Sequence, residues 1–261
     1  MKSLSNSSKM GRDLWGLKSN SMLVKGTIAT VTYRTASFYL LKTPMAWIKL
    51  DTSQTRAEEI GNVSTHAIGA LLSLVALVLL TLFAAYQNDS LKMVSSIVFG
   101  CTLLLMYVCS TVYHSMTDPK IKHLFRILDH ASIYLLIAGS YTPFVLVTLN
   151  GSLGWTIFTI IWSLALVGIL FKWFFVHKFD LLSTLIYLLM GWMALILIKP
   201  LYQLLPPGGL TYIVAGGLCY TVGVIFYIWE RLIFSHVLWH LFVLSGSICH
   251  FFAVLFYVII V

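Results

Sequence analysis

Residues 67–85 read AIGALLSLVALVLLTLFAA, an apolar run that contains no charged side chain. A helix needs about 20 apolar residues to cross the hydrocarbon of a bilayer, so this run, extended to 62–86, is long enough to span a membrane. Similar segments follow at 91–115, 127–148, 152–172, 180–199, 208–230 and 236–260. They are apolar on all sides and do not alternate with a period of two, which predicts helices and not barrel strands. The expected fold is all-α, a polytopic membrane protein with a bundle of seven transmembrane helices.

The composition of the whole chain excludes most soluble classes of protein. Of its 261 residues, 59% are hydrophobic and 10% are charged, and the mean hydropathy is +0.90. Soluble domains carry about 25% charged residues. An ordinary soluble enzyme, a disordered protein and a nucleic-acid-binding domain are therefore excluded, despite a net charge of +8. The four cysteines lie in apolar runs, which predicts reduced thiols and no disulfide framework.

The basic residues predict how the helices are oriented. Lys and Arg collect on the cytoplasmic side of membrane proteins. With a cytoplasmic N-terminus, only Lys92 and Lys199 of the 17 Lys and Arg residues would lie outside. We therefore expect the N-terminus in the cytoplasm and, after seven spans, the C-terminus outside.

Residues 1–55 differ from the rest of the chain, because they are basic and contain few acids. We expect them to form a basic, poorly ordered cytoplasmic tail, followed by a seven-helix membrane domain over 56–261. A transit-peptide-like segment would have a similar composition. The expected location is thus the plasma (cytoplasmic) membrane, with an organelle membrane as the alternative that the tail leaves open.

Ionisable side chains inside membrane spans are costly and usually functional. The predicted spans contain His66, His114, Asp129, His130, His236, His240 and His250. Given the predicted orientation, all of them except His250 fall in the cytoplasmic half of the bundle. The i,i+4 spacing of His236 and His240 places both imidazoles on one helix face, and Ser110 and His114 share a face in the same way.

This cluster suggests a metal site. Two His from one helix and one from another can fill three positions around a tetrahedral Zn²⁺ and leave the fourth to water, although imidazole also suits Cu, Fe and Ni. Asp129 could act as the base for that water or ligate the metal directly. The same residues could instead form a proton relay or a hydrogen-bonded packing cluster. Ser110 could simply bond the carbonyl four residues earlier, and His250 is expected to be a satisfied packing residue and not a ligand.

Three blocks of sequence resemble a known family. The first is EEIGNVSTH at 58–66; the second comprises STVYH at 110–114, RILDH at 126–130 and IAGSYTPF at 137–144; the third is HVLWH at 236–240, followed by SGS at 245–247. In this order they resemble the haemolysin III family, part of the progestin and adipoQ receptor superfamily. The pair Asp129-His130 is similar to the bacterial-type branch, because the eukaryotic receptors more often have Tyr after the Asp.

The resemblance implies a seven-helix bundle with a cytoplasmic N-terminus. It also implies a zinc site formed by His114, His236 and His240, with Asp129 in contact with the zinc-bound water and Ser110 lining the site. The superfamily is grouped with alkaline ceramidases as membrane metal-dependent hydrolases, and its animal receptors are associated with ceramidase activity.

The expected function is that of an integral membrane zinc protein of the haemolysin III type, acting as a metal-dependent lipid amide or ester hydrolase at the cytoplasmic half of the bundle. Whether it is an enzyme is left open. One alternative is a non-enzymatic sensor or regulator of membrane state with a structural zinc; another is a haemolytic, pore-forming protein. A pore is disfavoured because no span carries a polar stripe along its full depth. The expected partners are membrane lipids and a lipid-like substrate or ligand, with no nucleic acid, and the oligomeric state is undetermined by the sequence.

Overall fold

The computed structural model describes residues 54–176, 178–229 and 231–261. The predicted tail at 1–55 lies outside the described residues except for its last two positions. The arrangement below is that of the membrane unit, residues 48–261, where the structure describes it.

The predicted all-α class with seven spans is confirmed. The described residues form seven helices long and apolar enough to cross a membrane, so the chain is an integral membrane protein. The spans are α2 (Arg56–Gln87), α3 (Ser90–Ser115), α4 (Pro119–Pro143) with the π-helix η2 (Phe144–Leu149), α5 (Gly151–Phe175), α6 (Asp180–Trp192) with the 3₁₀-helix η3 (Met193–Leu197) and α7 (Ile198–Leu204), α8 (Pro207–Ile228), and α9 (Ser235–Val254) with the π-helix η4 (Leu255–Ile259).

Short polar residues begin the first three helices. Thr55 caps α2 in a capping box with Glu58, since each side chain bonds the other's backbone N–H. The carboxylate of Asp89 accepts from the first N–H groups of α3, and that of Asp118 does the same for α4. These side chains satisfy N–H groups that the helix itself leaves unpaired.

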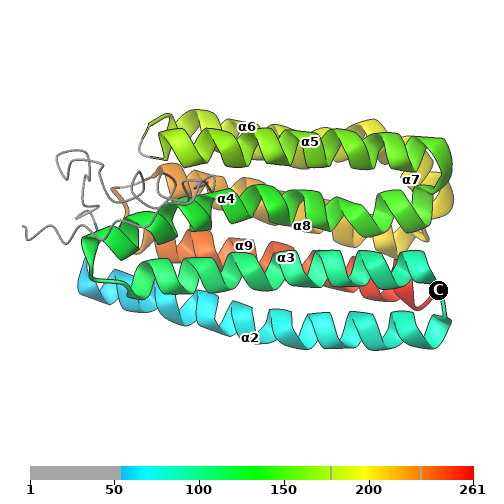
Figure 1. Ribbon diagram of the computed structural model, residues 1–261, viewed down its shortest axis with the longest axis horizontal. Coiled ribbons are helices and arrows are strands. Elements are labelled where there is room, and N and C mark those ends of the chain that lie inside the picture. The colour runs from blue at the N-terminus through cyan, green and yellow to red at the C-terminus, as the bar shows by residue number, and fades with distance from the viewer. Residues whose placement is uncertain (1–53, 177, 230) are drawn as a thin grey trace, which may run out of the picture. The chain divides into compact units, whose positions relative to one another are not determined.

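The helices lie side by side, and the last span packs against the first (Figure 1). The most extensive contacts join α2 with α3, α8 with α9, and α3 with α4. An 18-residue apolar stretch was compared in each span. Of this stretch, 56% is buried in α3 and 67% in α4 with η2, whereas 22% is buried in α5. Large apolar side chains on the outer faces are exposed, among them Leu71 at 68% and Val167 at 64%. Such faces are suited to contact with lipid.

Two sets of polar contacts join elements whose pairing was not predicted from the sequence. Tyr141 on α4 donates through its hydroxyl to the carbonyls of Met190 (2.9 Å) and Gly191 (2.6 Å), where α6 gives way to η3. Lys92 at the start of α3 donates through Nζ to the carbonyls of Ile259 (3.0 Å) and Val261 (2.6 Å), at the end of the last span. Backbone groups freed where a membrane helix changes form need such partners.

A buried charge also lies inside α5. Lys172 is fully buried, and its Nζ is 2.9 Å from Asp180 Oδ1 at the start of α6. Arg126 on α4 approaches the other oxygen of the same carboxylate at 3.6 Å. From the sequence, Lys172 was expected to be a cytoplasmic charge at the end of a span. In the structure, it is part of the packing of α4, α5 and α6.

Candidate metal centre

The structure brings together the three histidines predicted as metal ligands. His114 lies in the last turn of α3, and His236 and His240 lie in the first turns of α9. One ligand atom from each residue lies within 4.8 Å of the others. The ring centroids of His236 and His240 are 4.6 Å apart, and His114 is 5.1 Å from the first and 5.0 Å from the second. Three imidazoles from two helices thus converge at one end of the bundle.

The hydrogen bonding of His114 fits a metal ligand. Its Nδ1 lies 2.6 Å from Glu59 Oε2, whereas its Nε2 is buried and has no hydrogen-bond partner in the described residues. A buried nitrogen without a partner is unfavourable unless something else binds it. Three imidazole nitrogens are also a donor set that zinc accepts, so the residues present are compatible with zinc.

His66 supports the cluster from α2 without belonging to the ligand group. Its ring stacks on that of His240 with a centroid separation of 3.5 Å and an interplanar angle of 19°. Tyr107 contacts the ring of His66 edge-on at 5.0 Å. Parallel stacking leaves the two imidazoles side by side, which restricts how the ring of His240 can turn.

Asp129 and Ser110 lie on the wall of a cavity that also touches His236 and His240. The side chain of Asp129 is 14% exposed, and its Oδ2 lies 3.7 Å from Nδ1 of His130. That ring nitrogen of His130 is closer, at 2.9 Å, to the carbonyl of Arg126. The hydroxyl of Ser110 is buried with no hydrogen-bond partner in the described residues. The alternative that Ser110 bonds the carbonyl four residues earlier is therefore wrong.

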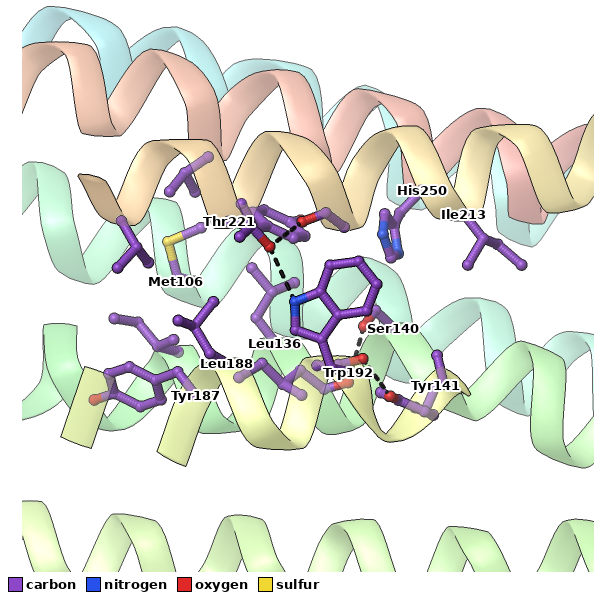
Figure 2. A pocket seen from close by; sticks show the side chains of 18 of the residues that line it. Met106, Leu136, Ser140, Tyr141, Tyr187, Leu188, Trp192, Ile213, Thr221 and His250 are labelled. Atoms are coloured by element: carbon purple, nitrogen blue, oxygen red, sulfur yellow. Dashed lines mark hydrogen bonds between the residues drawn. The ribbon is translucent and has the colours of Figure 1, made fainter. Parts of the chain in front are cut away.

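The cavity has a volume of about 180 Å³ and a mostly apolar wall. Its lining residues include members of α3, α4, α6, η3, α7, α8 and α9, and Trp192 and Ile213 are among them (Figure 2). Trp192 donates through Nε1 to Thr221 Oγ1 at 3.0 Å, which satisfies both groups within the wall. A long apolar space that begins beside polar groups suits a molecule with a polar end and an apolar chain.

His250 also lines this cavity and is outside the group of three histidines. The expectation that it is a satisfied packing residue is wrong in one respect. Both of its ring nitrogens are buried and neither has a hydrogen-bond partner in the described residues. On α8, Gly216 lies against the ring, and the ring of Tyr220 is 5.5 Å away between centroids.

Glu58 and Glu59, in the first turn of α2, flank the site. Neither was predicted from the sequence to be part of it. Glu59 contacts His114, as above, and its other oxygen lies 2.6 Å from Lys122 Nζ. Glu58 accepts a hydrogen bond of 2.9 Å from the backbone N–H of Phe234, just before α9 begins. The available signal was their position at the start of the first span, at the same predicted depth as His114.

The amino-acid sequence of this chain is similar to those of several known proteins. Residues 54–251 match the family described as "Haemolysin-III related". The chain is 52% identical to "Hemolysin-3" of Bacillus cereus over 202 residues, which are 77% of this chain and 92% of that protein. It is 52% identical to the "Hemolysin-3 homolog" of Bacillus subtilis (strain 168) over 78% of this chain and 95% of that protein. A third relative, "Monocyte to macrophage differentiation factor" of Homo sapiens, is 28% identical over 76% of this chain and 83% of that protein. No solved structure matches.

Proposed function

The chain belongs to the Haemolysin-III related family, and we propose that it is a zinc-dependent membrane hydrolase that cleaves an amide or ester bond of a lipid. One observation carries this proposal. Three histidines could hold a metal ion, two of them, His236 and His240, line a mostly apolar cavity, and Asp129 lies on the wall of that cavity. A metal with only a structural role has no need of such a space.

The three histidines would hold the ion through one nitrogen each. Bound there, zinc would polarise a carbonyl and lower the pKa of a bound water toward about 7. Asp129 is the carboxylate among the residues that line the cavity with His236 and His240, so it would be the group that accepts a proton. Ser110 lies on the wall of the same cavity as Asp129 and is available to hold a polar group of the substrate.

The apolar part of the cavity selects the substrate class. Its wall between α4, η3, α7 and α8 is mostly apolar, so it favours an acyl chain and excludes water from the reacting end. The lipid would present its polar end to the histidines. With the predicted orientation, the histidines lie at the cytoplasmic side, and the plasma membrane is the proposed location. Membrane lipids are the proposed partners.

A structural metal in a membrane sensor is the second candidate, and the burial of the ligands favours it. His114 is 4% and His240 is 2% exposed. Structural zinc sites are closed and use every position for protein ligands. The open cavity beside His236 and Asp129 favours the hydrolase over this reading.

The experiment is a metal analysis joined to a lipid-hydrolysis screen. Wild type and His236→Ala would be purified in parallel and assayed for zinc and for release of fatty acid from lipid amides and esters. The hydrolase proposal expects about one zinc per chain and hydrolysis in wild type, and loss of both in the variant. Zinc in wild type with no hydrolysis above the level of His236→Ala would favour the structural metal. Hydrolysis that is equal in both preparations would identify a contaminant and remove the support for an enzyme.

A further inference from the structure

We propose that Glu59 is a positioning residue of the metal centre, which fixes the tautomer and the orientation of His114. This inference rests on the proposed metal site and does not depend on hydrolysis. Glu59 comes from α2, which contributes no ligand to the group of three histidines.

The bond between the two side chains defines where the proton lies. Glu59 Oε2 is 2.6 Å from His114 Nδ1, and the side chain of His114 is 1% exposed. An ionised carboxylate can only accept hydrogen bonds. The ring nitrogen must therefore carry the hydrogen and donate it to Glu59.

The other neighbour of Nδ1 does not compete for this position. The amide nitrogen of Asn62 is 3.5 Å from His114 Nδ1, but it donates to Gln54 Oε1 at 2.6 Å. The amide has a second hydrogen, but a contact of 3.5 Å is weak beside the 2.6 Å contact of Nδ1 with Glu59. Glu59 alone then determines which nitrogen of His114 is protonated.

The consequence falls on the opposite nitrogen of the ring. A neutral imidazole that is protonated on Nδ1 has its lone pair on Nε2. In His114 this Nε2 is buried with no hydrogen-bond partner in the described part of the chain, so it is the nitrogen left for the ion. Histidines that bind metals commonly donate their other N–H to a carboxylate, which orients the ring and raises its basicity.

Lys122 completes the arrangement from a third helix. Its Nζ is 2.6 Å from Glu59 Oε1, the oxygen that does not face His114. The ammonium group favours the ionised carboxylate and holds it in place. Glu59 thereby connects α2, α3 and α4 around one ligand.

Close packing of α2 on α9 keeps the same turn of α2 near the other ligands. A Cβ added to Gly61 would lie only 2.8 Å from Cγ2 of Val237, the residue after His236. Glu58 and Glu59 lie just before Gly61 in α2 and make different contacts. Glu58 accepts from the N–H of Phe234, whereas Glu59 contacts a ligand directly.

The test measures zinc affinity by competition with a chelator on the purified full chain. Removing a carboxylate that supports a metal-binding His typically weakens binding about 10- to 100-fold, and we expect this loss for Glu59→Ala. Glu59→Gln should lose less, because its amide oxygen still accepts from Nδ1. Glu58→Gln is the matched control. It keeps an acceptor for the N–H of Phe234 and should bind zinc as wild type does.

A second measurement separates positioning from a general loss of structure. Nitrogen NMR of isotope-labelled histidine reports which ring nitrogen carries the proton. Metal-free wild type should show His114 protonated on Nδ1, and Glu59→Ala should show a mixture of tautomers. Unchanged affinity and tautomer in Glu59→Ala, or an equal loss of affinity in Glu58→Gln, would overturn the inference. The expected losses of affinity in a protein without lipid hydrolysis would support this inference while the proposed enzyme fails.

Discussion

The imidazole of His66 on α2 lies parallel to that of His240 on α9, with ring centroids 3.5 Å apart. Only one of the two belongs to the group that can hold a metal. The stack therefore supports a ligand by its shape and not by donating a nitrogen. Substitutions of His66 can distinguish these two roles.

His66→Phe should retain zinc, because a flat ring still packs against His240. His66→Ala should weaken zinc binding by about tenfold, the lower end of the effect seen when the support of a ligand is removed. Metal analysis and chelator competition on the two variants would check this. A loss of zinc in His66→Phe as large as that in a ligand variant would make His66 a ligand instead.

His236→Ala should lose most of the bound zinc, because two histidines are a poor site for the ion. His250→Ala serves as the control, since His250 lies on the same helix but outside the group of three. It should keep the metal content of wild type. Equal zinc in wild type and in a variant lacking all three of His114, His236 and His240 would refute the site.

Asp129→Asn keeps the shape of the side chain but cannot act as a carboxylate base. If Asp129 takes a proton during hydrolysis, the variant should fold and bind zinc yet lose about 10²- to 10⁴-fold in rate. The measurement is hydrolysis and zinc content in parallel preparations of both proteins. Loss of zinc along with activity would make Asp129 a ligand, and undiminished hydrolysis would remove it from the reaction.

The buried pair of Lys172 and Asp180 predicts an asymmetric effect on stability. Asp180→Asn leaves the ammonium group of Lys172 fully buried without its carboxylate. That should cost about 3 kcal/mol, as breaking a buried pair from one side does. Lys172→Met leaves Asp180, which is 38% exposed and still near Arg126, and should cost less. Thermal unfolding in detergent would compare the two. A larger loss in Lys172→Met would contradict this account.

The orientation of the bundle is a separate prediction. The distribution of Lys and Arg predicts that the C-terminus lies outside. A reporter that is active only in the cytoplasm should be silent when fused to the C-terminus and active when fused to the N-terminus. A strong cytoplasmic signal from the C-terminal fusion would reverse the orientation.

The fold could be predicted from the sequence because its determinants are local. The length and apolar character of each segment define a span, and the described part of the chain contains seven such spans. The convergence of His114 with His236 and His240 also followed, since the spacing along α9 and the alternation of the spans place all three at one end. The break of α6 at Met193 was not foreseen, and the hydroxyl that bonds the carbonyls next to it comes from Tyr141, which is distant in the sequence.

The environment of the site was less predictable. Nothing in the spacing of the chain pairs Glu59 with His114, since that contact depends on the rotation of α2 against α3. The same holds for the stack of His66 on His240 and for the orphaned nitrogens of His250. These contacts depend on which faces of two helices meet. The pattern of residues along one helix does not determine that.

The contact of Lys92 with the carbonyls of Ile259 and Val261 bears on how the protein responds to bilayer thickness. It ties the start of α3 to the end of the last span, while the opposite ends of α3 and α9 carry the three histidines. With a metal bound as proposed, the two spans would be joined at both ends and would resist sliding past one another in a thinner or thicker membrane. Hydrophobic mismatch would then be accommodated by tilting of less buried helices, such as α5. The spacing of the three histidines would accordingly depend little on the lipid composition around the protein.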